Sequence, residues 1–375
     1  MLLTTGESGI TPIPSGASIG SIILRFIAIG ALLYLFVLAI TMLGASFKLM
    51  GKEFAKSLFY ATSNPVAGLA IGILATSIIQ SSSTTTSIVV GLVGTGMLSF
   101  QAAIPMVMGA NIGTSVTNTI VSLAHISRGD EFKRAFAGST VHDFFNLCAV
   151  LVLLPLQMFY NIIGVSAHAM GSFVTGFGGL KYSSPLKAIS KPVAKALIHF
   201  LGDNPWVSIV VAIVLLFIAL RYIVKVLKSM VLSKVERFFQ RYVFRTPALG
   251  FALGILVTVF VQSSSISTSV VVPLVGAGVI TLAQIFPYTL GANIGTTVTS
   301  FLASFVIGTD EAVSVAFAHL IFNIDGISIF WPLKRIPIGL AERLSNLTQR
   351  FKLAPIVYIV VVFFVIPSLL LLLLD

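Results

Sequence analysis

Charged side chains are scarce in this sequence. Only 9% of its 375 residues are Asp, Glu, Lys or Arg, whereas 57% are hydrophobic. Soluble domains carry about 25% charged residues, and a water-soluble fold of this length would need a charged shell that the sequence cannot supply. A soluble protein is therefore excluded, and the composition indicates an integral membrane protein.

Cysteine is nearly absent, and acidic residues are few. The single cysteine, Cys148, cannot form a disulfide within the chain, and its apolar surroundings predict a packing role. The 12 acidic residues face 23 basic ones, giving a net charge of +11. The basic residues gather between apolar segments and do not alternate with aromatic ones, so we expect no nucleic-acid partner.

The motifs of common enzymes are missing as well. The sequence has no Cys/His cluster with metal-ligand spacing, no nucleotide-binding loop and no supported Ser-His-Asp order. Serines without an adjacent base are poor nucleophiles. We therefore predict that the protein is not an enzyme and needs no cofactor. The first 17 residues are polar and lack the basic start of a cleavable signal peptide.

What the sequence has instead is apolar segments of two lengths. A membrane-spanning helix needs about 20 mostly apolar residues. Segments of that length are predicted at 19–47, 134–160, 206–230, 312–333 and 355–374. Shorter apolar segments, interrupted by Gly, Pro and polar residues, are predicted at 65–79, 84–99, 101–123, 247–261, 266–281 and 284–305. The fold class is an all-α membrane protein.

The short segments form an internal repeat. Gln-Ser-Ser-Ser occurs at 80–83 and again at 262–265, and Gly-Ala-Asn-Ile-Gly-Thr occurs at 109–114 and at 291–296. Both pairs are offset by 182 residues, from 80 to 262 and from 109 to 291. Further along, His142 corresponds to His319, an offset of 177. Duplication of a hydroxyl-rich segment in an apolar chain predicts one site built from two halves.

Each Gln-Ser-Ser-Ser stretch lies between two segments too short to cross a membrane comfortably. We expect two re-entrant helical hairpins, at about 65–99 and 247–281, with the polar stretch at each tip. Paired interrupted segments are the best sequence indication of a transporter's binding site, and non-helical backbone at membrane depth must be buried in protein or face water.

Charge predicts the orientation of the repeats. The basic residues collect in 128–134, 225–245 and 334–352, which places these connections and the N-terminus in the cytoplasm. An odd number of crossings separates the hairpins, so they enter from opposite faces and the two repeats are inverted. We expect a first repeat at 1–160, an extracellular inter-repeat loop at 161–205, a second repeat at 206–352 and a C-terminal transmembrane helix at 353–375.

The serine-rich tips suit an anion. A helix start offers free backbone N–H groups and a positive dipole end, and serine hydroxyls add donors without adding charge. Hydroxyls and the Gln carbonyl also accept hydrogen bonds, which favours monohydrogen phosphate over sulfate. The alternative is that these small residues only allow close helix packing.

The Gly-Ala-Asn-Ile-Gly-Thr stretches suit a hard cation such as Na⁺. Asn111 and Asn293 offer amide oxygens, Thr114 and Thr296 offer hydroxyls, and flanking glycines permit an unwound backbone. Glycine-packed helix crossings are the alternative. Asp143, within an apolar span, is a second candidate, because ionisable residues in the membrane are expensive and usually functional. A salt link from Asp143 to His142 or to an arginine is the competing explanation.

These motifs resemble the type II sodium-dependent phosphate cotransporter family. The resemblance covers roughly residues 30–350 and extends to 132–138, 141–146 and 322–324. It implies Na⁺-driven uptake of inorganic phosphate, with both tips forming the phosphate site. It also implies that Asp143 serves a charge-carrying Na⁺, that Asn146 and Thr296 belong to another Na⁺ site, and that the two Gln residues serve both ions.

The complete set of expected ligands follows from the motifs and the resemblance together. Phosphate is expected at Gln80, Ser81, Ser82, Ser83, Gln262, Ser263, Ser264 and Ser265. Sodium is expected at Gln80, Thr84, Asn111, Thr114, Asp143, Asn146, Gln262, Asn293, Thr296 and Asn323. No other metal is expected. The chain lacks the long Cys-containing loop and the cytosolic tails of animal members, and this compactness indicates a bacterial inner-membrane protein.

We therefore predict a secondary transporter that imports phosphate with Na⁺ by alternating access. Its partners are phosphate, Na⁺ and the lipid bilayer, and a homo-oligomer is left open. A passive anion channel would need a continuous polar stripe. A carrier for a dicarboxylate or sulfate, or one driven by protons, would more often place an arginine at the tips. A membrane enzyme is the remotest alternative.

Overall fold

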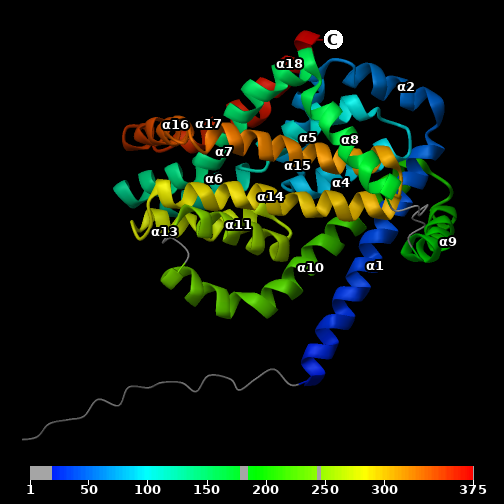
Figure 1. Ribbon diagram of the computed structural model, residues 1–375, viewed down its shortest axis with the longest axis horizontal. Helices are drawn as coiled ribbons and strands as arrows, with labels where there is room; N and C mark the ends of the chain where they lie inside the picture. Colours follow the sequence, from blue (N-terminus) through cyan, green and yellow to red (C-terminus); the bar gives the residue numbers. More distant parts are fainter. Residues whose placement is uncertain (1–18, 178–184, 243–245, 375) are drawn as a thin grey trace, which may run out of the picture.

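The computed structural model describes residues 19–177, 185–242 and 246–374, and within these ranges it consists of helices and their connections (Figure 1). The described part contains no β-strand, as expected from an all-α membrane protein. The N-terminal segment, on which the predictions about a signal peptide and a cytoplasmic N-terminus depend, lies outside these ranges.

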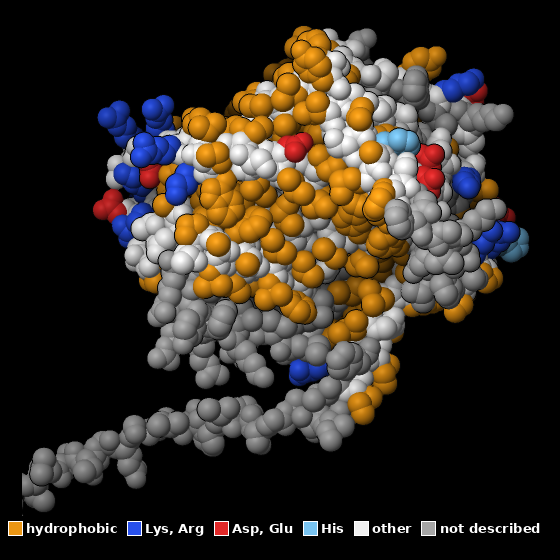
Figure 2. All heavy atoms as spheres, in the orientation of Figure 1, with side chains coloured by type: hydrophobic (Ala, Val, Ile, Leu, Met, Phe, Trp, Pro, Cys, Tyr) orange, Lys and Arg blue, Asp and Glu red, His pale blue; other side chains and the backbone are white. Residues whose placement is uncertain are grey.

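Six helical segments of the described chain are long and apolar enough to cross a membrane. They lie in α1 (Ile19–Leu49), α7 (Gly129–Tyr160), α10 (Pro205–Tyr242), α14 (Leu282–Ile307), α15 (Asp310–Phe330) and the C-terminal run Ala354–Leu374. Figure 2 shows hydrophobic side chains over the middle of the visible face and charged ones at its left and right margins. The chain is therefore an integral, multi-pass membrane protein.

Five of these six segments confirm the predicted long helices. The sixth, α14, was expected to be one of the shorter, interrupted segments, and instead it is a continuous helix of 26 residues. The C-terminal run consists of α17 (Ala354–Val360), a π-helical turn η3 (Val361–Val365) and α18 (Ile366–Leu374).

Each half of the chain also contains short helices around its Gln-Ser-Ser-Ser stretch. The first half has α3 (Pro65–Ile79), α4 (Ser82–Gly94), α5 (Phe100–Gly113) and α6 (Val116–Ser122). The second half has α11 (Pro247–Val261), α12 (Ser264–Ser269), α13 (Val272–Gly276) and then α14. In each half the helix before Gln-Ser-Ser-Ser packs along the helix that carries Gly-Ala-Asn-Ile-Gly, α3 on α5 and α11 on α14.

Glycines make these two contacts close. A Cβ added at Gly72 would overlap the carbonyl oxygen of Met106, and one added at Gly254 would overlap that of Tyr288. The two glycines are equivalent in the repeat, with the same offset of 182 from 72 to 254. Close backbone approach through small residues is the usual way helices associate in lipid, so the repeated glycines are explained by packing.

The two halves differ in where their helices break. The first half interrupts the chain at Thr114 and Ser115, between α5 and α6, whereas α14 runs through the equivalent position. The second half interrupts it at Val270 and Val271, between α12 and α13, where α4 is continuous. Pro273 explains the second break, because proline removes a backbone donor and clashes with the preceding turn.

The segment 161–205, expected to be a loop, is largely helical. It contains α8 (Ile162–Phe177), which packs against α15, and α9 (Pro185–Phe200), which packs against α1. The prediction of a loop rested on the Gly, Ser and Lys content of this segment. The other helices are α2 (Gly51–Thr62), bent by 101° from α3, α16 (Arg335–Asn346), and the 3₁₀ turns η1 (Leu123–His125) and η2 (Leu347–Gln349).

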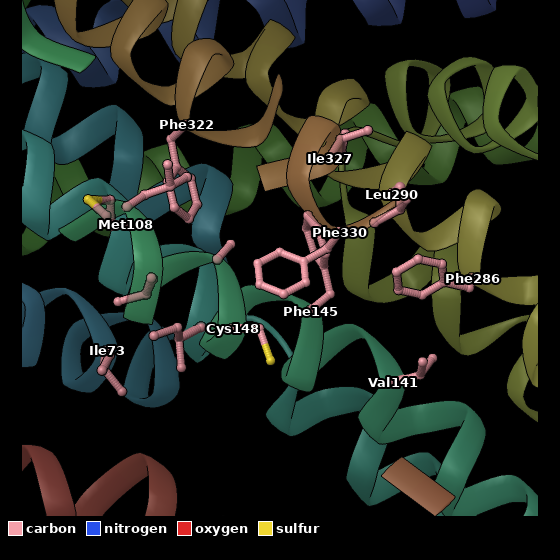
Figure 3. Close-up of a cluster of buried hydrophobic side chains, with 14 of the residues drawn as sticks. Ile73, Met108, Val141, Phe145, Cys148, Phe286, Leu290, Phe322, Ile327 and Phe330 are labelled. Carbon is pink, nitrogen blue, oxygen red and sulfur yellow. The ribbon is translucent and has the colours of Figure 1, made fainter. Parts of the chain in front are cut away.

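A shared aromatic core joins the two halves (Figure 3). Phe145 of α7 packs edge-on against Phe286 of α14, with ring centroids 6.1 Å apart, and against Phe330 of α15 at 6.4 Å. The same cluster includes Ile73 of α3 and Met108 of α5. Because residues of both repeats pack in one core, the two Gln-Ser-Ser-Ser stretches are brought into the same region of the protein.

Candidate functional site

The two Gln-Ser-Ser-Ser stretches, called tip 1 (residues 80–83) and tip 2 (residues 262–265), have the same backbone geometry. Gln80 and Gln262 end α3 and α11 in the left-handed region, with φ of 58° and 54°. Ser81 and Ser263 follow in an extended conformation and cap the next helices, accepting from the N–H groups of Thr84 and Ile266. Non-glycine residues with positive φ are uncommon and concentrate at functional sites.

Both the oxygen and the nitrogen of each glutamine side-chain amide form a hydrogen bond. The hydroxyl of Thr117 donates to Gln80 Oε1 at 2.9 Å, and that of Thr299 donates to Gln262 Oε1 at 2.7 Å. The amide nitrogens donate to the carbonyls of Ser77 and Val259. The two threonines were not predicted, although their offset of 182, from 117 to 299, is a signal that could have found them.

The tips lie in direct contact. Ser83 Oγ of tip 1 donates to the carbonyl oxygen of Gln262 in tip 2 at 3.1 Å. Ser265 Oγ of tip 2 donates to the carbonyl oxygen of Thr114 at 2.8 Å, at the break between α5 and α6. The interrupted helix thus supplies a backbone acceptor to the opposite tip. The serines Ser82, Ser83, Ser264 and Ser265 are buried, whereas Ser81 and Ser263 are half-buried.

A layer of polar contacts beside the tips also joins the halves. Asn118 donates to Thr268 Oγ1 and accepts from Ser269 Oγ, both at 2.7 Å. Ser300 and Thr86 are equivalent in the repeat to Asn118 and Thr268, and Ser300 Oγ donates to Thr86 Oγ1 at 3.2 Å. Each contact runs from one repeat to the other, so the duplicated residues meet in corresponding pairs.

The expected cation ligands Asn111 and Asn293 form a second such layer. The ring nitrogen His142 Nε2 lies 2.5 Å from Asn293 Oδ1, and His319 Nε2 lies 3.4 Å from Asn111 Oδ1. An amide oxygen only accepts, so the histidines donate here. Both histidines were left out of the predicted site, and the structure makes each of them the partner of an asparagine in that predicted set.

Other expected sodium ligands have hydrogen bonds of their own. Asn146 donates to the carbonyl of Asn111 at 3.0 Å and accepts from Asn293 at 2.8 Å. Thr114 and Thr296 each donate to the carbonyl four residues earlier, at 2.9 Å. Donating hydroxyls keep lone pairs that can still face a cation. Thr84 and Asn323 are two further expected ligands. The Thr84 hydroxyl donates to Ser81 Oγ, whereas Asn323 Oδ1 is buried without a hydrogen-bond partner.

Asp143 is fully buried in α7 and is not part of a salt link. Its Oδ2 accepts from the hydroxyl of Tyr358 at 3.2 Å, and its Oδ1 has no hydrogen-bond partner. Ser115, which is also buried, lies close enough to the carboxyl group for its hydroxyl to interact with it. His142 is engaged with Asn293, and Asp143 takes part in none of the ion pairs found in the described residues. The salt-link explanation is therefore not supported. Tyr358 was not predicted.

Most of the unpartnered buried oxygen atoms belong to helices that carry the site. They include Thr76 and Thr258, which are equivalent in the repeat, together with Ser115, Asp143 and Asn323. Buried polar groups are nearly always hydrogen-bonded, so each exception calls for an explanation. Within the described residues no group of three or more His, Cys, Asp or Glu could hold a metal ion.

The chain belongs to the Na⁺/Pi-cotransporter family, whose pattern matches residues 35–184 and 215–336. It is 34% identical to the sodium-dependent phosphate transport protein 2A of Rattus norvegicus, over 94% of this chain and 68% of that protein. It is 31% identical to the sodium-dependent phosphate transport protein 2B of Homo sapiens, over 92% of this chain and 64% of that protein. No solved structure matches the chain significantly.

These comparisons confirm the resemblance that the motifs indicated. They also confirm that the chain is not an enzyme, because its relatives are transport proteins by name. The chain spans about two thirds of the length of these relatives. The family membership covers both tips and the helices around them.

Proposed function

We propose that this protein is a secondary active transporter that imports inorganic phosphate together with Na⁺. The observation that carries the proposal is the contact between the tips, where Ser83 of tip 1 donates to the carbonyl of Gln262 in tip 2. Two oxyanion-binding loops that touch each other are suited to hold one ligand between them. The similarity to proteins named as sodium-dependent phosphate transporters supports the choice of ions.

Phosphate in this proposal is held by hydroxyl and backbone donors from both tips. Ser82, Ser83, Ser264 and Ser265 stand at the first turns of α4 and α12, where free N–H groups and the positive helix end favour an anion. The tips touch in the described conformation, so phosphate would replace the Ser83–Gln262 contact. Neutral donors bind without a permanent charge, which suits a ligand that must be released.

Sodium in this proposal binds before phosphate and supplies the positive charge that the tips lack. Asp143 Oδ1 and Ser115 Oγ, both buried and adjacent, would serve one ion. A second ion would use oxygens of Asn323, Thr296 and the other predicted ligands near the histidine–asparagine layer. Na⁺ is a hard cation that accepts such oxygen donors, and unwound helix ends add carbonyl groups.

The proposed transport cycle depends on two inverted repeats, each with a re-entrant hairpin. Helices α3 with α4 and α11 with α12–α13 would form the hairpins, entering the bilayer from opposite faces and meeting at the tips. Alternating access would then expose the site to one side at a time. The corresponding pairs of contacts between the halves support a two-fold arrangement of this kind.

The decisive experiment measures labelled phosphate uptake by the purified protein in proteoliposomes. An inward Na⁺ gradient should drive accumulation, and a reversed gradient should drive efflux. Ser83→Ala and Ser265→Ala should each lower uptake by roughly tenfold, because each removes a hydrogen bond worth about 1.5 kcal/mol at a buried anion. Ser328→Ala is a matched control, since Ser328 is exposed and bonds only within α15.

Sodium-independent flux that runs down the phosphate gradient would instead indicate an anion channel. Uptake of sulfate or a dicarboxylate at the same rate would indicate a carrier for another anion. Full activity of both serine variants would remove the tips from the site.

A further inference from the structure

A cavity of about 580 Å³ lies away from the tips, between α7, the start of α14 and α16. It adjoins the connection between α13 and α14, called elbow 2 (residues 277–281). Its wall contains two cations, Lys133 and Arg134, with the polar side chains of Thr281 and Asn346. Ile280 and Ile338 form an apolar part of the same wall. The cavity lining therefore combines basic, polar and apolar side chains.

The two cations are placed differently. Arg134 is fixed, because its Nε donates to the carbonyl oxygen of Gly276 at 2.8 Å, at the end of α13. Lys133 is half-buried and forms no hydrogen bond or ion pair with any described residue. The one acidic residue of the wall, Glu342, is exposed. A half-buried, unpaired ammonium group beside a cavity indicates an anionic ligand.

The cavity lies at a margin of the apolar surface. Helix α16 buries Ala341 and exposes Ile336, which is 47% accessible, while Leu347 just beyond it is 51% accessible. In Figure 2 a group of Lys and Arg side chains lies at the left margin, where Figure 1 places α16 and α13, and others lie at the right margin. Apolar side chains exposed next to cations at such a margin match the level of lipid headgroups in a bilayer. A ligand bound at the level of the headgroups could therefore be a lipid, with its anionic group in the cavity and its acyl chains against the exposed apolar side chains.

The fold does not require cations at this position. The equivalent connection of the first half, elbow 1 (residues 95–99), also adjoins a cavity, whose wall contains Lys56 and Glu311. With the offset of 177 that relates His142 to His319, Lys133 corresponds to Asp310 and Arg134 to Glu311. The repeat therefore accommodates two acids where this cavity has two bases. The basic pair is a property of one end of the protein and not of the repeated architecture.

We propose that this cavity binds the phosphate group of an anionic phospholipid. Lys133 and Arg134 contact the phosphate, Thr281 and Asn346 supply hydrogen bonds, and the acyl chains lie along the apolar wall. A bound lipid would connect α7, α16 and elbow 2, and Arg134 would link it to the end of α13. Basic pockets between membrane helices on the basic side of a protein are suited to such headgroups.

The test uses the purified full chain in a neutral detergent and titrates it with soluble short-chain phospholipids. Dihexanoyl phosphatidylglycerol should bind saturably, and dihexanoyl phosphatidylcholine should bind much more weakly. Lys133→Gln should weaken phosphatidylglycerol binding about fivefold, the effect of one cation near an anionic headgroup. Lys133→Arg should retain binding. Arg350→Gln is the control, because Arg350 is exposed on the same part of the chain but does not line the cavity.

Equal binding of the two lipids, or unchanged binding by Lys133→Gln, would overturn the proposal. Displacement of phosphatidylglycerol by millimolar inorganic phosphate or glycerol phosphate would show a site for water-soluble phosphate, and this too would overturn the lipid assignment. If Lys133→Gln does not fold, Lys133→Met keeps the aliphatic stem and decides the outcome. Uptake of phosphate does not enter this test, so its result is independent of the transport proposal.

Discussion

Asp143 is the residue with the sharpest expected phenotype. Its carboxyl group is fully buried, with one oxygen bonded to Tyr358 and the other unpartnered. If it binds a Na⁺ ion that crosses the membrane with phosphate, Asp143→Asn should remove that ion and its charge. We expect the transport current in proteoliposomes or whole cells to be abolished, while some phosphate uptake persists. The transport current and the uptake of labelled phosphate are measured on the same preparation.

Tyr358→Phe is the matched control for this prediction. It removes the hydroxyl that bonds Asp143 but leaves the carboxyl group in place, so current should be reduced and not abolished. An unchanged current in Asp143→Asn would exclude Asp143 from charge transport.

Thr117 and Thr299 should act on the tips through the glutamines. Each hydroxyl donates to the amide oxygen of a glutamine whose backbone is in the left-handed region. Thr299→Val keeps the side-chain shape and removes the donor, leaving a half-buried amide oxygen unsatisfied at a cost of about 1–3 kcal/mol. We expect the phosphate concentration that gives half-maximal uptake to rise between about fivefold and one-hundredfold, with little loss of expression. Thr297→Val, which removes a bond made only within α14, is the control.

At the scale of helices, the pairing of α3 with α5 and of α11 with α14 depends on glycines. Gly254→Ala would place a methyl group against the carbonyl of Tyr288 and should destabilise the protein by about 1–3 kcal/mol through overpacking. The control is Gly339→Ala in α16, where the added Cβ would have nothing within 4 Å. There alanine should be neutral or stabilising. Thermal unfolding in detergent would compare the melting temperatures of Gly254→Ala and Gly339→Ala. Equal melting temperatures would contradict the packing argument.

The helices show clearly what the sequence could and could not predict. Uniform apolar runs such as α1, α7 and α15 were predicted within a few residues, because length and hydropathy fix a span. The repeat also predicted that tip 1 and tip 2 share one geometry, since both are bounded by the same residue types. The break before Pro273 and the continuity of α14 were not predicted. Both are differences between the two halves, whereas the prediction assumed that equivalent segments have the same structure. Helices α8 and α9 depend on contacts with α15 and α1 that no local pattern indicates.

The site was predicted as a set of residue types and not as a network. The serines, asparagines and Asp143 were predicted from the repeat and from the cost of charge in an apolar span, and as ligands they stay a prediction. Their partners Thr117, Thr299, Tyr358 and the two histidines were not, because a hydrogen bond between residues distant in the sequence leaves no local pattern. Only the offset of the repeat could have indicated some of them.

At the scale of the whole molecule, the proposed inverted arrangement makes a direct prediction. Ser99 and Thr281 are exposed, equivalent residues that cap α5 and α14 next to elbow 1 and elbow 2. In a Cys148→Ala background, Ser99→Cys should react with a membrane-impermeant maleimide from one side only, and Thr281→Cys from the other side only. Because both changes remove the same kind of cap, each variant controls for the other. Labelling of both from one side would exclude inverted hairpins.

The unequal breaks in the two halves have a consequence for transport in the two directions. In an exactly two-fold carrier, the gate toward the outside and the gate toward the inside would be the same structure and would open at equal cost. In the proposed cycle the two gates would not be equivalent, because one half contains the interruption at Thr114 and Ser115 and the other contains the interruption before Pro273 beside the unbroken 26-residue helix α14. Their opening would then have unequal cost. Right-side-out and inside-out vesicles should therefore show different half-saturating phosphate concentrations under the same sodium gradient, so that the carrier rectifies.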